Sequence, residues 1–355
     1  VYYSGEFDIE WGQSITKTHN FKKYEIEKFK HWLKYNGYDW NDPKLALGYI
    51  KIGQVDMELA FPDKSFIEVY NVMKDNLKKA QTLIEALPYI QKFRGKTVVL
   101  KFGGSIGSKE FANFARDLVL FNYVGINPVV VHGGGKEISK ALTSSGIKPN
   151  FIDGLRVTCD KTMEIVEKVL VGKVNKQIVS KIKSCGGTSI GLSGKDQQLF
   201  KVKKIKSPKK GIDLGRVGEI IKVNVSYIFE LQKKGLIPVI APIGVNSKGL
   251  AFNINGDYAA SKIAASLNAE KLIILTDVEG IRDMENNLIS SITKKKANSL
   301  IKKGVIVSGM VPKVKCMLDA LSDGVKKAHI IDGRISHSLV LETFTDSGIG
   351  TEILL

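Results

Sequence analysis

The chain has 355 residues and is 43% hydrophobic, so it is long enough to bury a large core. Its formal charge is +17, but only six of its 53 basic residues are arginines, which specific nucleic-acid recognition favours over lysines. We interpret the charge as a lysine-rich solvated surface that attracts small anions, and we expect no nucleic-acid partner. No stretch approaches the roughly 18 apolar residues of a membrane span and no signal peptide is visible, so we expect no membrane partner.

The cysteines indicate the compartment. Cys159, Cys185 and Cys316 have a spacing that fits neither a metal site nor a disulfide framework. Chains without structural disulfides are typical of reducing compartments. We therefore expect three buried free thiols in a cytoplasmic protein.

The first 65 residues differ in character from the rest. They hold all three tryptophans and 13 of the 29 aromatic residues. Residues 22–35 have the apolar periodicity of a helix, which Gly37 would end. The segment contains no acid and base pair and no metal-type spacing, so we predict a small aromatic-cored extension over residues 1–65. The alternative is that this segment is the main functional unit.

Residues 66–92 predict one amphipathic helix, with its pattern running from Ile67 to Lys92. Its apolar side chains recur at helical spacing on one stripe, which consists of Leu77, Ala80, Leu83, Ile84 and Leu87. A stripe of this kind usually packs on its own domain. We expect Pro88 to break the helix.

From Thr97 onward, short apolar runs alternate with helical stretches. This alternation predicts a largely parallel sheet between helix layers, which is an α/β fold. Strands are expected at 98–102, 128–131, 236–240, 271–275 and 328–331, and helices near 109–122, 136–145 and 161–185. Residues 186–220 interrupt the alternation in the way that a β-hairpin insertion would.

Two glycine clusters, Gly103-Gly104 and Gly133-Gly134-Gly135, follow the first two of these strands. Glycines at the carboxyl end of a buried strand let the backbone approach a polyanion and present N–H groups to it. Neither cluster has the spacing of a dinucleotide fingerprint or a P-loop, and each alone could be an ordinary tight turn. Together, and with Lys101 inside the first run, they predict a phosphate cradle.

Four further segments follow in order: 154–158, 253–257, 275–281 and 309–313. Each alone is compatible with a turn, an N-cap, a strand end or a helix start. Taken with the glycine clusters, they resemble the amino acid kinase family from about Asn71 to the C-terminus, and within it the members that phosphorylate N-acetyl-L-glutamate. The resemblance implies an αβα sandwich with an open, mainly parallel central sheet. Residues 93–250 would form a lobe that binds the acyl amino acid and makes dimers, and residues 251–355 a lobe that binds ATP.

By this resemblance, the γ-phosphoryl group of ATP moves to the side-chain carboxylate of N-acetyl-L-glutamate, in the second step of arginine biosynthesis. A carboxylate is already ionised at neutral pH, so the transfer needs alignment and charge neutralisation rather than a general base. Lys101 and Lys313 match the two catalytic lysines of the family. Asp257 matches the acidic residue that holds them apart while keeping both charged.

The resemblance also implies the residues that bind substrates. Backbone amides of Gly104, Gly134 and Gly135 would contact the polyphosphate or the attacking carboxylate. Arg156 would clamp the α-carboxylate with two parallel hydrogen bonds, and Asn253 would contact the acetamido group.

ATP would lie over the carboxyl ends of the strands in the second lobe. The residues matched to nucleotide binding are Gly103, Thr276, Asp277, Gly280, Gly309 and Met310. No dedicated set of carboxylates for a metal is visible, so Mg²⁺ would be held mainly by the nucleotide and water.

The C-terminal stretch looks like the signature of the arginine-inhibited members. His329, Glu342 and Gly348 would line the inhibitor pocket, with the carboxylate pairing the guanidinium of arginine. In those members a helix like the one over residues 71–90 interlaces dimers into a hexamer, so we expect a homo-oligomer, either a dimer or a hexamer. The alternative to an inhibitor pocket is a solvated C-terminal turn.

Two other functions stay open. One is a related amino acid kinase, above all one that acts on carrier-bound aminoadipate. The other is a catalytically silent arginine sensor, although the presence of Lys101, Asp257 and Lys313 argues against it.

Overall fold

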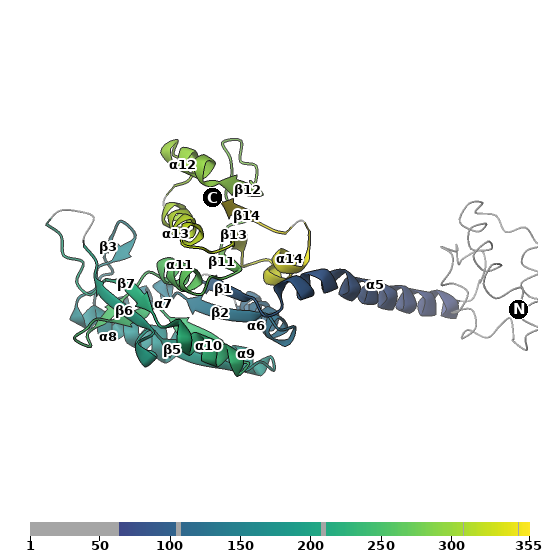
Figure 1. Ribbon diagram of the computed structural model, residues 1–355, viewed down its shortest axis with the longest axis horizontal. Coiled ribbons are helices and arrows are strands. Elements are labelled where there is room, and N and C mark those ends of the chain that lie inside the picture. The colour runs from purple at the N-terminus through teal and green to yellow at the C-terminus, as the bar shows by residue number, and fades with distance from the viewer. Residues whose placement is uncertain (1–63, 104–107, 207–210, 308, 347) are drawn as a thin grey trace, which may run out of the picture. The chain divides into compact units, whose positions relative to one another are not determined.

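The structure is a computed structural model, and it describes residues 64–355 apart from 104–107, 207–210, 308 and 347 (Figure 1). The helix expected over residues 22–35 and the glycine at position 104 lie outside the described residues. The chain divides into two compact units, Val1–Leu87 and Pro88–Leu355. The functional residues predicted from the sequence all belong to the second unit.

Helix α5 extends over Lys64–Phe93, which confirms the helix expected over residues 66–92. It continues through Pro88, so the expected break at this proline is wrong. A proline inside a helix removes one backbone hydrogen bond without necessarily ending the helix. The expectation that the apolar stripe packs on its own domain is also wrong, because Leu83 is 72% and Ile84 69% exposed.

The second unit is built on one eight-stranded sheet with the order β12-β14-β13-β11-β1-β2-β8-β5 (Figure 1). All neighbouring strands are parallel except β13 and β14. This arrangement confirms the expected mainly parallel sheet. The strands are β1 (Thr97–Phe102), β2 (Asn127–His132), β5 (Ser189–Ser193), β8 (Ile237–Ala241), β11 (Lys271–Thr276), β12 (Ser291–Thr293), β13 (Lys327–Asp332) and β14 (Thr351–Leu354).

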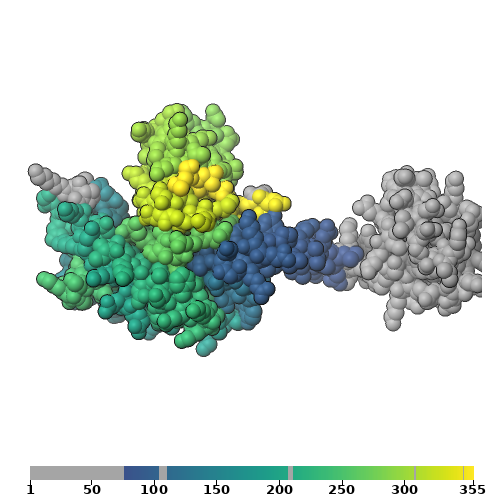
Figure 2. All heavy atoms as spheres, viewed as in Figure 1, coloured from purple at the N-terminus to yellow at the C-terminus, as the bar shows by residue number. Residues whose placement is uncertain are grey.

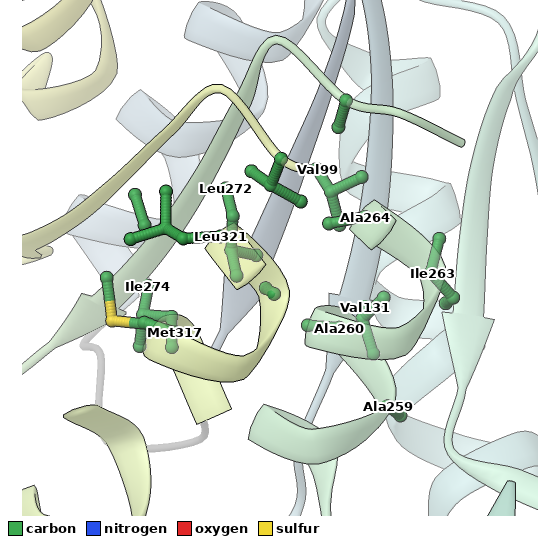
Figure 3. Close-up of a cluster of buried hydrophobic side chains, with 14 of the residues drawn as sticks. Val99, Val131, Ala259, Ala260, Ile263, Ala264, Leu272, Ile274, Met317 and Leu321 are labelled. Carbon is green, nitrogen blue, oxygen red and sulfur yellow. The ribbon is translucent and has the colours of Figure 1, made fainter. Parts of the chain in front are cut away.

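Helices cover both faces of this sheet. On one face, Ala260 and Ile263 of α11 and Met317 of α13 pack over Val99 and Leu272 (Figure 3). Strand residues of the opposite parity, which point to the other face, are also fully buried, so the fold is the expected αβα sandwich. The helices are α6 (Ser108–Tyr123), α7 (Gly135–Ser144), α8 (Asp160–Val169), α9 (Lys176–Ser184), α10 (Val225–Lys233), α11 (Gly256–Ser266), α12 (Lys294–Lys302), α13 (Met310–Ser322) and α14 (Ser338–Phe344).

The long helical region expected over residues 161–185 is confirmed, with one irregularity. Between α8 and α9 the chain forms a π-helix, η1 (Leu170–Asn175), without leaving the helical path. A π-helix has hydrogen bonds between residues five apart and is rare outside functional sites. It lies beside the strands β5 and β8.

The interruption expected over residues 186–220 is only partly correct. Strands β6 (Phe200–Lys204) and β7 (Gly218–Val223) do form an antiparallel pair, in a small sheet with β9 (Ile243–Val245) and β10 (Ala251–Asn253). Residues 189–193, however, belong to the main sheet as its edge strand β5. A short 3₁₀ turn, η2 (Asp196–Gln198), and the hairpin of β3 (Phe151–Ile152) with β4 (Leu155–Arg156) complete the described elements.

The expectation of three buried thiols is wrong. All three cysteines are free, but Cys159 is exposed and Cys185 and Cys316 are partly exposed. Among the described residues, no helix has both the length and the apolar character to cross a membrane.

Parallel pairing places the carboxyl ends of β1, β2 and β11 at one edge of the sheet. Lys101 on β1 is in register with Val131 on β2 and with Ile274 on β11. Residues 93–250, drawn blue to green, and residues 251–355, drawn green to yellow, form one continuous body in the space-filling view (Figure 2). Residues from both expected lobes therefore meet at this edge.

Candidate active site

Two lysines and one aspartate meet at the carboxyl edge of the sheet. Lys101 Nζ lies 2.9 Å from Asp257 Oδ1, and Lys313 Nζ lies 2.7 Å from Asp257 Oδ2. The three side chains are 11–19% exposed and come from β1, α11 and the first turn of α13. Two ammonium groups and one carboxylate leave a net positive charge in a largely dry site, which favours an anion.

The charge state of Asp257 follows from its partners. Burial alone would raise the pKa of this carboxyl, but the charges and hydrogen bonds of Lys101 and Lys313 outweigh burial and lower the pKa below its usual value. Asp257 is therefore ionised at neutral pH, and it holds the two ammonium groups on opposite oxygens.

A residue that the sequence analysis missed positions Asp257. Asn255 is the N-cap of α11, and its side chain accepts hydrogen bonds from the amides of Asp257 (2.9 Å) and Tyr258 (3.1 Å). Asparagine is among the best N-cap residues, so its place two residues before Asp257 was a usable signal. Because Asn255 caps the helix, the Asp257 carboxylate is free to pair with the lysines.

A pocket of about 210 Å³ opens beside this ion set. It brings together residues from β1, the start of α7, β4, β10 and the start of α11. Six residues that the sequence analysis predicted line this pocket: Lys101, Gly134, Gly135, Arg156, Asn253 and Asp257.

Arg156 is prepared to bind an anion. Its Nη2 donates to the Gly135 carbonyl and to Ser139 Oγ, both at 2.9 Å, and its guanidinium lies 4.5 Å from the centre of the Phe151 ring. Its Nη1 is buried and has no hydrogen-bond partner among the described residues. Burial lowers the pKa of Arg156, but a guanidinium stays charged in proteins. The protein thus binds Nη2 of the guanidinium, while Nη1 is left for a ligand.

Local contacts position Asn253 and Gly134. Asn253 Nδ2 donates to Thr158 Oγ1 at 3.2 Å, which fixes the amide at the pocket wall. A Cβ added at Gly134 would lie 2.6 Å from Leu170 Cδ2, so a larger residue there would require the Leu170 side chain to move. Gly103 lies close to the Lys101 ammonium, which a Cβ at that position would approach to 3.6 Å.

The comparisons agree with this geometry. The profile of the "Amino acid kinase family" matches residues 96–332. The protein "Acetylglutamate kinase" of Aquifex aeolicus (strain VF5) is 52% identical to this chain. The match covers 80% of this chain and 100% of that protein. The protein of the same name from Geobacter sp. (strain M21) is 49% identical over 79% of this chain and 99% of its own.

The chain belongs to the amino acid kinase family. The resemblance stated from the sequence is thereby confirmed, and so is the fold that it implied.

Solved structures extend this result. N-acetylglutamate synthase from Neisseria gonorrhoeae, complexed with coenzyme A and N-acetyl-glutamate, aligns with a TM-score of 0.71 and 27% identity over 78% of this chain. The chain spans 63% of that structure. Carbamate kinase from Giardia lamblia bound to AMP-PNP aligns with a TM-score of 0.54 and 17% identity over 73% of this chain and 98% of its own, which shows the fold alone.

The residues matched to nucleotide binding do not line the pocket beside Lys101, although Gly103 is close to the Lys101 ammonium. Thr276 ends β11, and its Oγ1 lies 3.3 Å from Asp277 Oδ1. Gly280 has a φ of +157°, and a Cβ there would lie 2.6 Å from Thr351 Oγ1, so packing on the C-terminal strand already requires glycine. Gly309 and Met310 begin α13, the helix that carries Lys313.

Within the described part of the chain, no group of three His, Cys, Asp or Glu side chains is placed to hold a metal ion. Asp257, the carboxylate nearest the reacting groups, is already paired with two lysines. Mg²⁺ would therefore arrive as part of the nucleotide substrate, with phosphate and water as its ligands.

A second pocket, of about 250 Å³, lies at the opposite edge of the same sheet. It brings together His329, Glu342 and Gly348, as the resemblance implied. Lys271 and Lys327, the first residues of β11 and β13, also line it, so it lies at the amino ends of these strands.

Glu342 is the centre of a buried network in this second pocket. Its Oε1 lies 3.0 Å from Lys271 Nζ and 2.8 Å from His329 Nδ1, and its Oε2 accepts the Ile349 amide at 3.0 Å. Burial alone would raise the pKa of Glu342, but these partners lower it to about 2. The sequence analysis missed Lys271, because a lysine that begins a buried strand carries no local signal of its partner.

Proposed function

We propose that the chain phosphorylates the side-chain carboxylate of N-acetyl-L-glutamate with ATP, giving N-acetyl-L-glutamyl 5-phosphate and ADP. This is the second step of arginine biosynthesis, and we assign it to the cytoplasm. The observation that carries the proposal is the pairing of Lys101 and Lys313 with the two oxygens of Asp257 beside a glycine-lined pocket. Relatives about 50% identical over nearly their whole length bear the name acetylglutamate kinase.

The reaction requires charge neutralisation more than proton transfer. The attacking carboxylate is ionised at neutral pH, so no general base is needed. Lys101 neutralises oxygens of the transferred phosphoryl group, and Lys313 neutralises charge on the leaving β-phosphate. Asp257 holds the two lysines apart on its two oxygens, so the site is preorganised before the substrates bind.

The pocket beside Lys101 fits an acyl amino acid with two carboxylates. The free Nη1 of Arg156 binds the α-carboxylate, and Asn253 contacts the acetamido group. The amides of Gly134 and Gly135 begin α7, where the first N–H groups of a helix have no partner within the helix and attract negative charge. They hold the reacting side-chain carboxylate toward the incoming phosphoryl group.

MgATP occupies the carboxyl ends of β11 and the start of α13, where Thr276, Asp277 and Gly309 lie. Mg²⁺ would come with the nucleotide and would neutralise part of the phosphate charge. Lys313, in the first turn of α13, brings its ammonium to the phosphates from this side.

Trapping of the acyl phosphate with hydroxylamine tests the proposal. The purified protein is incubated with MgATP and, in separate reactions, with N-acetylglutamate, glutamate, aspartate or N-acetylaminoadipate. Hydroxamate formation with N-acetylglutamate alone, at a rate that saturates with its concentration, is expected. Preference for N-acetylaminoadipate would replace the proposal with the aminoadipate-type activity, and no product with any acid would favour a silent sensor.

We also propose that arginine inhibits the enzyme by binding in the second pocket. His329 Nε2 is buried there without a hydrogen-bond partner among the described residues, and Glu342 and Glu352 offer carboxylates for a guanidinium. Adding arginine to the trapping assay should raise the concentration of N-acetylglutamate needed for half-maximal rate. An identical rate curve with and without arginine would refute the inhibitor site and leave the kinase activity standing.

A further inference from the structure

We propose that His132 and Asn175 form a buried positioning pair that fixes the orientation of the Gly133–Gly134 peptide, so that its N–H group faces the reacting carboxylate and phosphoryl group. This inference rests on the proposed kinase function and adds two residues to it. Neither residue touches the substrates in this account, so both are positioning residues rather than catalytic ones.

The proton positions on His132 follow from its neighbours. His132 ends β2, is fully buried, and has its Nδ1 3.0 Å from the Gly133 carbonyl oxygen and its Nε2 3.1 Å from Asn175 Nδ2. A carbonyl can only accept, so Nδ1 carries the proton and Nε2 accepts from the amide of Asn175. Burial, with the nearby charge of Lys101, lowers the pKa of His132 to about 4. The ring is therefore neutral at physiological pH and serves as a fixed donor.

The hydrogen bond to the Gly133 carbonyl determines where the next amide points. In a trans peptide the C=O of one residue and the N–H of the next point in opposite directions. No cis peptide bond occurs in the described part of the chain. Holding the Gly133 carbonyl on the side of His132 thus turns the Gly134 N–H to the other side. Gly133 and Gly134 line the pocket together with Lys101, so that is where this amide donates.

Asn175 in turn fixes the imidazole ring. Its Nδ2 also lies 2.8 Å from the Val239 carbonyl and 3.2 Å from the Leu192 carbonyl, on β8 and β5. A Cβ at Gly191 would lie 2.0 Å from Asn175 Oδ1, so a glycine is needed to make room for the amide. The two N–H bonds of this amide are shared among acceptors from three strands, β2, β5 and β8, which fixes its orientation.

The π-helix η1 explains how one segment supports the whole glycine loop. It begins at Leu170, whose side chain packs on Gly134, and it ends at Asn175, which holds His132. These residues are five apart, the spacing of hydrogen bonds in a π-helix, and therefore lie on nearly one face of it. A regular α-helix would direct one of the two away from the loop.

A matched pair of substitutions at one position separates the two hydrogen bonds. In His132→Asn the side-chain amide takes the place of Nδ1 and still donates to the Gly133 carbonyl. In His132→Gln the amide takes the place of Nε2 and reaches only Asn175. We expect His132→Asn to keep kcat within about threefold of the wild type, and His132→Gln to lose about 10- to 100-fold in kcat. KM for N-acetylglutamate should change less than about threefold in both, because Arg156 binds the ground state.

A binding measurement distinguishes positioning from loss of packing. Affinity for MgADP alone should be equal in the wild type and both variants. Affinity for MgADP with aluminium fluoride and N-acetylglutamate, which mimics the transferring phosphoryl group, should fall only in His132→Gln. Equal losses in both variants, or full activity in both, would overturn the inference. A wild type without activity toward N-acetylglutamate would instead refute the proposed function.

Asn175 provides a second test if His132→Gln fails to fold. Asn175→Ser should lower kcat about tenfold in the wild type but less than about twofold in the His132→Asn background, because Asn175 acts through the imidazole ring. Additive losses in the double variant would show that the two residues act independently and would overturn the inference.

Discussion

At the scale of single residues, the burial of Asp257 serves the site rather than the stability of the fold. Burying a carboxylate with two ammonium groups removes three charges from water, and a buried ion pair often adds nothing to stability compared with apolar packing. Asp257 and Lys101 are nonetheless only 8% and 9% exposed. The geometry is useful because the two lysines stay charged and separated whether or not a nucleotide is present.

Arg156 allows a prediction about substrate affinity. Arg156→Lys should raise KM for N-acetylglutamate about 10- to 100-fold with a smaller effect on kcat, because the compact ammonium of lysine lacks the planar fork that bonds the Gly135 carbonyl through one nitrogen and leaves the other for a carboxylate. Steady-state kinetics in the hydroxylamine assay measure both constants. Arg116→Lys is the control, since Arg116 is an exposed residue of α6 that donates to Asn113 and does not line the pocket. An unchanged KM in Arg156→Lys would remove the α-carboxylate from this position.

Glu342 allows a prediction about pH. Its pKa is about 2 in the folded chain and about 4.3 in an unfolded one, so its stabilising effect is complete above about pH 5 and is lost as the pH falls toward 2. The difference in unfolding free energy between the wild type and Glu342→Gln should therefore narrow by about 1–2 kcal/mol between about pH 6 and about pH 3. Urea unfolding of both proteins at several pH values measures this difference in unfolding free energy.

The control for this pH experiment is Glu219→Gln, which removes an exposed carboxylate 3.4 Å from Lys203. For that variant we expect the difference in unfolding free energy to stay the same across this pH range, because a solvent-screened ion pair contributes little to stability. A constant difference for Glu342→Gln would show that folding does not lower the pKa of Glu342.

At the scale of elements, α5 presents an apolar stripe to solvent. Leu77, Leu83, Ile84 and Leu87 are 45–72% exposed, although their spacing is that of a buried face. We propose that a second copy of this helix covers the stripe in a homo-oligomer. The double variant Leu83→Glu and Ile84→Glu should then shift the molar mass measured by light scattering to a smaller assembly.

The kinase rate without arginine should change little in that double variant, because both residues precede the unit that holds the site. Lys78→Glu with Lys79→Glu, on the same helix but outside the stripe, is the matched control and should leave the assembly intact. An unchanged molar mass in the apolar variant would exclude the stripe as an interface.

The elements differ in how far the sequence predicts them. β1, β2 and β11 are unbroken apolar runs, which a strand buried on both faces requires, so their places are visible in the sequence. β5 was missed because Ser189 and Gly191 interrupt its apolar pattern. The space that Gly191 leaves for Asn175 explains this interruption. The π-helix was invisible because one wide turn does not disturb the apolar period of the helices around it.

The same contrast holds within the site. Lys101, Asp257 and Lys313 were predicted because they stand in sequence segments with a fixed order. His132, Asn175 and Lys271 were not, since the partner that gives each its role is 43 to 71 residues away in sequence. Long-range hydrogen bonds leave no local pattern, so they appear only when the strands are paired.

At the scale of the whole molecule, the chain combines a formal net charge of +17 with a proposed site for two anionic substrates. A basic field raises the local concentration of anions, and salt screens it over about 10 Å at 0.1 M. We expect KM for MgATP and for N-acetylglutamate to rise about three- to tenfold between about 25 and 300 mM KCl. The buried lysines are screened less, so kcat should change less than about twofold. An equal osmotic concentration of sucrose is the control, and a fall in kcat at constant KM would contradict the field argument.

One strand connects the two pockets. Lys271, at the start of β11, pairs with Glu342, and Thr276, at its end, lies on the side proposed for the nucleotide, about 17 Å away along the backbone. β11 is paired by backbone hydrogen bonds with β1 on one side and β13 on the other, so its length is fixed. A displacement of one end along the strand axis therefore also displaces the other end. A ligand that separated Lys271 from Glu342 and displaced β11 along its axis would therefore also displace Thr276 at the other end of the strand.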